Sequence, residues 1–167
     1  MKLLTVFAVV ALVLTAAVPS FSQQADPGWY GRWNLESVQP GVGAPPAPKM
    51  GLAVIYESGW VYAGVDSTGA LEAEAIAYGP NNGCVLIGLP AQYTCTTKFT
   101  DPMHYEFSFL NKGITTSTNK CELSADRKTF KESSTTILPG GRQYTQESAW
   151  TKVAPASAKR AATPEKK

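Results

Sequence analysis

The feature of this sequence that most restricts its fold is a series of short segments in which apolar and polar residues alternate. The clearest of them spans residues 103–110. One side of this segment carries Met103, Tyr105, Phe107 and Phe109, and the other carries His104, Glu106 and Ser108. Successive side chains of a β-strand point to opposite faces, so this period of two predicts a half-buried strand.

Similar segments recur along the chain, separated by turn sequences rich in Gly, Pro, Asn and Asp. They cover residues 31–36, 51–56, 60–65, 70–78, 93–100, 103–110, 114–123, 129–138 and 142–153. About eight or nine short strands in sequential hairpins predict an all-β fold, with an antiparallel up-and-down barrel favoured over a sandwich. Closure of the sheet would remove its exposed edges.

The segment 70–78 allows a second interpretation, because Ala and Glu are good helix formers. We favour a strand because the segment is short and lies among strands. In this strand we expect one face to carry Leu71, Ala73, Ala75 and Ala77. The small alanines would face the interior and leave space there, and Glu72 and Glu74 would face solvent.

Both ends of the chain differ from the centre. Residues 1–22 have the layout of a cleavable signal peptide: Lys2, an apolar run from Leu3 to Val18, and small residues before a junction after Ser22. The apolar run is short for a membrane anchor, which needs about 20 residues. Residues 154–167 lack large apolar side chains and are expected to be a disordered basic tail. A single barrel domain is expected over residues 29–153, in a periplasmic or secreted protein with no integral membrane span.

The charge distribution argues against a nucleic-acid partner. The whole chain carries 15 basic and 13 acidic residues, but the leader and the tail hold five of the basic residues and one of the acidic ones. The central domain is therefore slightly acidic, and the basic excess belongs to the tail.

Three cysteines are present, Cys84, Cys95 and Cys121. Export to an oxidising compartment would permit a disulfide. Cys84 and Cys95 flank a segment with a Gly and a Pro that can fold back, so this is the favoured pair. The pairing of Cys95 with Cys121 is the alternative. A zinc site is not expected, because there is no C-x-x-C pair and only one His.

The residues available for catalysis are few, and we expect no enzyme activity, cofactor or metal. His104 is the only histidine, and it is interpreted as an exposed strand residue. Glu72 and Glu74 share a strand face at a separation of about 6–7 Å, which a glycoside hydrolase could use. Two solvated glutamates would give the same pattern.

Aromatic residues on the predicted strands are the candidates for a ligand site. The predicted barrel lining consists of Trp60, Tyr62, Phe107, Phe109 and Tyr144. Inward side chains of small barrels usually fill the interior, so a packed core is the competing interpretation.

Several short motifs resemble those of small exported lipocalin-like β-barrel domains of bacteria, a group mostly without assigned functions. The motifs are Gly31-Arg32-Trp33, Trp33-Asn34-Leu35, Pro45-Pro46-Ala47-Pro48-Lys49, Gly64-Val65-Asp66-Ser67-Thr68-Gly69 and Ser124-Ala125-Asp126-Arg127-Lys128-Thr129-Phe130. The resemblance covers residues 29–153 and implies a barrel in which Trp33 packs at the base. It supplies no catalytic residues. The cysteines and the segment between Cys84 and Cys95 depart from the group's pattern.

These observations predict an exported, non-enzymatic β-barrel that binds a small apolar or amphipathic ligand. One alternative is a protein-interaction module of the cell envelope, an inhibitor or accessory subunit that uses a strand edge or the Pro-rich segment. The other is a hydrolase that depends on Glu72 and Glu74.

Overall fold

The computed structural model describes residues 25–154. The predicted signal peptide and residues 155–167 of the predicted tail lie outside this range. The described chain has one short 3₁₀ helix, η2 (Pro27–Trp29), and ten strands. The strands are β1 (Gly31–Pro40), β2 (Met50–Tyr56), β3 (Gly59–Val65), β4 (Leu71–Tyr78), β5 (Gly83–Leu86), β6 (Tyr93–Asp101), β7 (His104–Asn111), β8 (Ile114–Leu123), β9 (Thr129–Ile137) and β10 (Gln143–Lys152).

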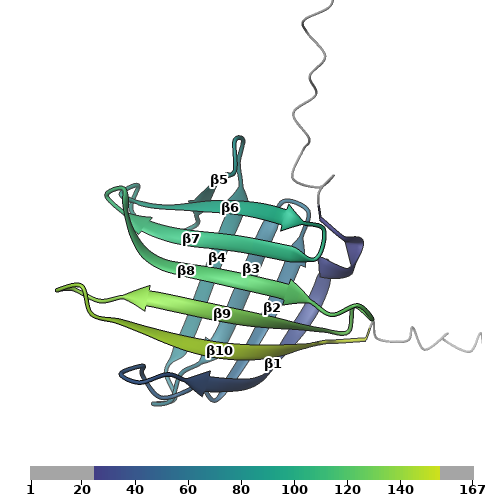
Figure 1. The fold of residues 1–167 in the computed structure, drawn as a ribbon, viewed down its shortest axis with the longest axis horizontal. Coiled ribbons are helices and arrows are strands. Elements are labelled where there is room, and N and C mark those ends of the chain that lie inside the picture. Colours follow the sequence, from purple (N-terminus) through teal and green to yellow (C-terminus); the bar gives the residue numbers. More distant parts are fainter. Residues whose placement is uncertain (1–24, 155–167) are drawn as a thin grey trace, which may run out of the picture.

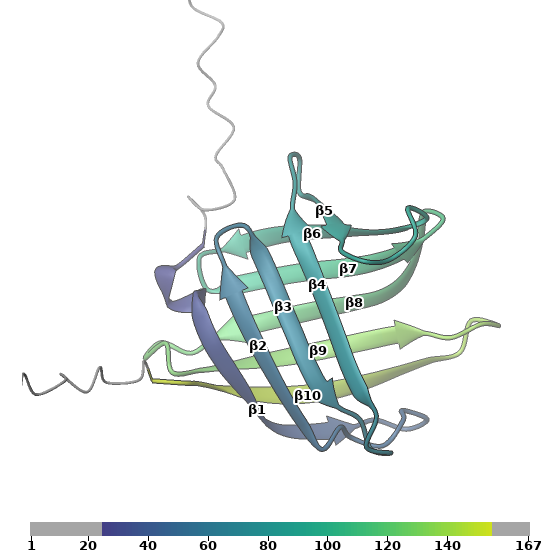
Figure 2. The same ribbon diagram turned by 180° about the vertical axis from the view of Figure 1, so that it is seen from behind.

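The strands form one closed antiparallel barrel (Figures 1 and 2). Each strand pairs with the next along the chain, and β1 closes the ring by pairing with both β2 and β10. The predicted all-β up-and-down barrel is therefore confirmed, and the helix considered for residues 70–78 is wrong. The strand count of eight or nine is too low, because Gly83–Leu86 forms the additional strand β5.

Strand β5 is short and is tied to its neighbour by a disulfide. It pairs with β4 and with β6 through only three residue pairs each. Cys84 lies directly opposite Cys95 in the β5–β6 pairing, with 5.0 Å between their Cα atoms, and the two form a disulfide. Cys121 is a free, buried thiol. The crosslink thus fastens the strand that has the fewest paired residues.

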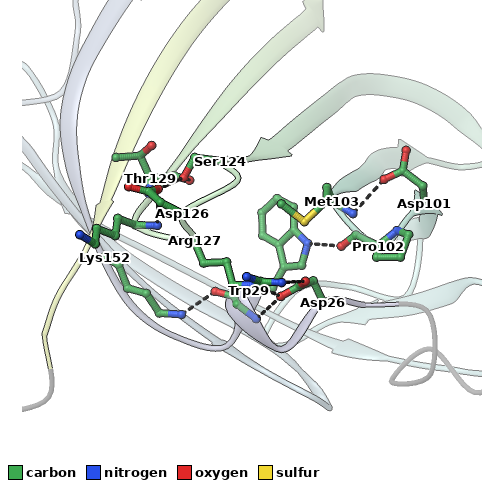
Figure 3. Close-up of polar contacts among 12 residues, drawn as sticks. Asp26, Trp29, Asp101, Pro102, Met103, Ser124, Asp126, Arg127, Thr129 and Lys152 are labelled. Atoms are coloured by element: carbon green, nitrogen blue, oxygen red, sulfur yellow. Dashed lines mark hydrogen bonds and ion pairs between the residues drawn. The ribbon is translucent and has the colours of Figure 1, made fainter.

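Helix η2 lies at the base of the barrel, the end at which β1 begins and β10 ends, and Figure 3 shows the polar contacts that hold it there. Asp26 caps this helix by accepting a hydrogen bond from the Gly28 amide at 2.7 Å, and Pro27 supplies a pre-set φ in its first turn. Both carboxylate oxygens of Asp26 accept hydrogen bonds from Arg127, at 2.8 Å each. Lys152 Nζ donates to the Gly28 carbonyl. The helix is thereby held by the β8–β9 turn and by the end of β10.

Two tryptophans pack beneath the barrel interior. Trp29 is 1% exposed, and its Nε1 donates to the Pro102 carbonyl at 3.0 Å. Trp33 is fully buried, and its Nε1 donates to the Trp29 carbonyl at 2.9 Å. The Trp33 ring meets Phe130 edge-on at 4.9 Å between centroids. This closed aromatic layer is the main hydrophobic core of the described chain.

We predict that Trp29→Ala lowers the free energy of unfolding by about 3–5 kcal/mol, because a large buried ring is replaced by a cavity and the Pro102 carbonyl keeps only the Asp26 amide as a donor. Urea denaturation followed by far-ultraviolet circular dichroism measures the change. Tyr56→Ala is the matched control, since Tyr56 is 52% exposed. Equal effects of the two substitutions would contradict the role of Trp29 in closing the base.

We also predict that the Cys84→Ser/Cys95→Ser variant loses about 3 kcal/mol of stability, as the chain-entropy model gives for a short loop. The loss should be local at first, because β5 has few other pairings. In hydrogen exchange, the β5 amides should lose protection while those of β9 and β10 keep theirs. Uniform loss of protection across the barrel would be inconsistent with this view.

Candidate functional site

A cavity of about 410 Å³ lies inside the barrel above the aromatic layer. It opens at the mouth, the end at which β2 begins and β3 ends. There the Pro-rich segment 45–48 and the turn at Asp66 and Ser67 contribute to its lining. The remaining lining residues come from η2, from β1 to β4 and from β7 to β10. The volume lies within the range of small-molecule sites, about 300–1,000 Å³.

All five residues of the predicted barrel lining lie on this cavity. They are Trp60, Tyr62, Phe107, Phe109 and Tyr144, called the aromatic wall below. The rings of Trp60 and Phe107 lie 5.5 Å apart across the barrel, and those of Phe107 and Phe109 also lie 5.5 Å apart. Trp33 is fully buried below the cavity and does not line it. Contact of the aromatic wall with a ligand remains a prediction.

Two glycines let Tyr62 lie against the barrel wall. A Cβ atom on Gly64 would come within 2.1 Å of the Tyr62 hydroxyl, and one on Gly51 within 3.0 Å of its ring. The ring therefore runs along β3 toward the mouth, over positions without side chains, and does not cross the cavity. The small residues that make room for the Tyr62 ring are thus Gly51 of β2 and Gly64 of β3. The alanines of β4, which were expected to leave space in the interior, do not do so.

The orientation predicted for β4 is wrong, because Glu72 and Glu74 line the cavity. Leu71 is 86% exposed, whereas Ile76 is 3% exposed. The register explains the reversal: Trp60 pairs with Ile76 and Tyr62 pairs with Glu74, and residues paired across two strands point to the same face. Ile76 and Tyr78 lie two and four residues after Glu74, so they point to the same face of β4 as the glutamates. These two large residues were the sequence signal that this face is the inner one.

A third carboxylate, Glu132 of β9, also faces the cavity. One of its oxygens accepts a hydrogen bond from Trp150 Nε1 at 3.1 Å. Burial raises the pKa of Glu132, and the bond from Trp150 opposes this rise. The sequence analysis gave Glu132 no role. It lies two residues after Phe130 on the same strand, however, and therefore points into the barrel as the Phe130 ring does.

Ser148 of β10 lies directly opposite Glu132 in the β9–β10 pairing. It lines the cavity and is 7% exposed. Its hydroxyl has no hydrogen-bond partner among the described residues. Ser148 and Glu132 therefore present oxygen acceptors side by side to the interior.

Burial, together with the charges of Glu132 and Glu72, raises the pKa of Glu74 to about 7. Burial also raises the pKa of Tyr62, and Glu72, Glu132 and Glu74 add to that shift. The charges of all three carboxylates thus raise the pKa of the same Tyr62 hydroxyl. The cavity combines an aromatic wall with a group of carboxylates whose charge is poorly compensated.

The other candidates from the sequence lie elsewhere. His104 is exposed on β7, and its Nδ1 lies 2.8 Å from Asp101 Oδ2, outside the cavity. The hydrogen bond to Asp101 raises the pKa of His104. Cys121 lines the cavity, and burial raises the pKa of its thiol. Within residues 25–154, no group of three or more His, Cys, Asp or Glu side chains is arranged to hold a metal ion.

Fold and site together define an antiparallel up-and-down barrel with an internal cavity. Comparison with protein-family models and with curated proteins gives no match. Among solved structures, the chain is similar to zebrafish ileal bile acid-binding protein complexed with cholic acid, at 12% identity and a TM-score of 0.36. The match covers 75% of this chain and 99% of the zebrafish chain. A likeness of this strength supports no inference about the ligand.

The raised pKa of Glu74 predicts a pH dependence of stability. The group has an ordinary pKa of 4.5 when unfolded and about 7 when folded, so the folded state binds more protons between these values. Its contribution to stability is therefore present at low pH and is lost as pH rises from 4.5 to 7. At about 1.4 kcal/mol per pKa unit, the full loss amounts to about 3 kcal/mol.

Glu74→Gln should remove the part of the pH dependence of stability that comes from Glu74. Urea denaturation of the wild type and the variant between pH 4.5 and pH 8 should show the variant gaining relative stability as pH rises. Glu147→Gln is the matched control, since Glu147 is exposed on β10. A parallel pH dependence of wild type and Glu74→Gln would disprove the assignment.

Proposed function

We propose that this protein is a non-enzymatic binding protein that takes up a small apolar or amphipathic molecule inside its barrel. The observation that carries the proposal is the cavity of about 410 Å³ bounded by the aromatic wall. Each 100 Å² of apolar ligand surface buried there contributes about 2.5 kcal/mol before association costs. Trp60, Tyr62, Phe107, Phe109 and Tyr144 are the proposed ligand contacts.

The surface around the mouth supports this proposal. Most large apolar side chains that are exposed in residues 25–154 lie at strand ends or loops of this end of the barrel. Examples are Val42 at 99%, Leu71 at 86% and Ile114 at 72% exposure. Such side chains give an apolar molecule a favourable surface beside the opening of the cavity.

The two alternatives have less support. Each of the ten described strands has a neighbour on both sides, so none is the edge strand of an open sheet that an envelope partner would extend. A hydrolase would place Glu72 and Glu74 around a bond to be cleaved, but Glu72 is exposed near the mouth. The sole histidine lies outside the cavity.

We further propose that the protein is exported and acts in the periplasm or outside the cell. The signal-like layout of residues 1–22 and the Cys84–Cys95 disulfide support this. Within residues 25–154 we find no helical segment with the length and hydropathy of a membrane span.

The neutral fluorophore N-phenyl-1-naphthylamine tests the binding proposal, because its emission rises in apolar surroundings. We predict saturable binding to the wild type. Ser134→Trp, on the cavity side of β9, should weaken binding at least 10-fold, since the indole occupies the space that the probe needs.

Ser133→Trp is the matched control, because Ser133 is the neighbouring residue of the same strand and does not line the cavity. It should leave the affinity within about twofold. No binding to the wild type, or equal loss in both variants, would refute the proposed function.

A further inference from the structure

The described residues that line the cavity include no Lys, Arg or His. Their charged members are carboxylates, and one of these, Asp66, is already satisfied by donors of its own turn. Asp66 Oδ1 accepts hydrogen bonds from the amides of Thr68, Gly69 and Ala70, each at 2.8 Å. Glu72, Glu74 and Glu132 have no comparable partners, so an anionic ligand would meet only like charge.

Glu74 of β4 and Glu132 of β9 lie on opposite sides of the barrel, and the charge of Glu132 acts on Glu74. Glu74 pairs with Tyr62 across β3 and β4. The Tyr62 ring stands edge-on to Trp150 at 6.2 Å between centroids, and Trp150 donates a hydrogen bond to Glu132. A chain of contacts through Tyr62 and Trp150 therefore links the two carboxylates.

Ser148 is an independent sign of an unfilled site. Its side chain is buried against the cavity beside Glu132, and its hydroxyl oxygen has no partner among the described residues. Because Ser148 faces the cavity, its hydroxyl is available to a polar group of a ligand that enters. An acceptor beside a carboxylate, with aromatic faces nearby, is the environment that a positively charged N–H donor requires.

We propose that the ligand carries a protonated primary or secondary amine, which binds between Glu74 and Glu132 while its apolar body lies against the aromatic wall. The inference rests on the proposed function and specifies its ligand. The ammonium donates hydrogen bonds to Glu132 and to the neighbouring Ser148 hydroxyl, and the charge of Glu74 attracts it from the opposite wall. It supplies the positive charge that the lining lacks, and the apolar body fills the space below, bounded by Trp60, Phe107 and Phe109.

The electrostatics agree with this arrangement. The titratable groups that share the cavity with Glu74 are Tyr62, Asp66, Glu72, Tyr105, Cys121, Glu132 and Tyr144. All of them are acids, so none can neutralise a carboxylate. With its pKa near 7, Glu74 gains charge as pH rises from 6 to 8, while an aliphatic amine stays protonated. Affinity for an amine should therefore rise over this interval.

Three ligands with the same ten-carbon chain test the inference by displacing N-phenyl-1-naphthylamine at pH 8. They are decylamine, 1-decanol and decanoate, which are cationic, neutral and anionic at that pH. We expect decylamine to bind at least 10-fold more tightly than 1-decanol, and decanoate to bind most weakly. The preference for the amine over the alcohol should be several-fold smaller at pH 6.

The Glu74→Gln/Glu132→Gln variant should lose the preference for the amine to within twofold and keep its affinity for 1-decanol. Glutamine at position 132 retains an oxygen that can accept from Trp150, so the packing is preserved. Glu122→Gln/Glu147→Gln removes the same net charge from exposed positions and should behave as the wild type. If the first variant does not fold, the pH profile of the wild type and Glu74→Gln alone carry the test.

Equal affinities for amine and alcohol, or tightest binding of decanoate, would overturn the inference and leave the proposed function intact. Failure of the probe and of all three ligands to bind the wild type would refute the proposed function itself. Loss of the amine preference in the exposed-charge control would assign it to net charge and would also overturn the inference.

Discussion

A closed sheet of ten strands encloses more space than its inward side chains can fill. Eight strands already give an interior that side chains only just occupy. This protein closes one end of the wider barrel with η2, whose Trp29 packs against Phe130 and accepts a hydrogen bond from Trp33 at its carbonyl. The bonds of Asp26 to Arg127 and of Lys152 to Gly28 hold that helix against two separate parts of the sheet. The aromatic residues needed for a core are thus concentrated at the base, and the opposite half stays open.

The open half is where the strand alternation has chemical consequences. Period two places every second residue inside, whatever its polarity, once the register is set. Pairing of Trp60 with Ile76 sets the register of β4, and the same pairing brings Glu72 and Glu74 inside. On β9, the inward position of Phe130 likewise places Glu132, two residues further along the strand, inside the barrel. Carboxylates enter the interior because apolar residues two positions away anchor their strands, and the interior then raises the pKa of Glu74 and Glu132.

Much of this architecture could be predicted from the sequence. Alternation and turn residues predicted the all-β meander, and aromatic parity identified five residues that line the cavity. The orientation of β4 was not predicted, because alanine was interpreted as interior and glutamate as exterior. This rule describes average burial and does not hold in a barrel with an open lumen. Strand β5 was missed because four residues that include an exposed Val85 carry little periodic signal. The clustering of Glu74 and Glu132 depends on strands far apart in sequence, which no local pattern encodes.

Carboxylates buried without cationic partners lower the stability of the empty protein at neutral pH, since folding must either desolvate their charge or keep them protonated. Such groups are seldom kept for packing alone, because an apolar side chain of similar size would fill the same space without that cost. The disulfide on β5 and the hydrogen-bonded base offset part of this loss in regions distant from the carboxylates. A ligand that supplies the missing positive charge would bind only the folded state and would stabilise it by mass action. The same residues would then set both the instability of the empty barrel and the selectivity of the filled one.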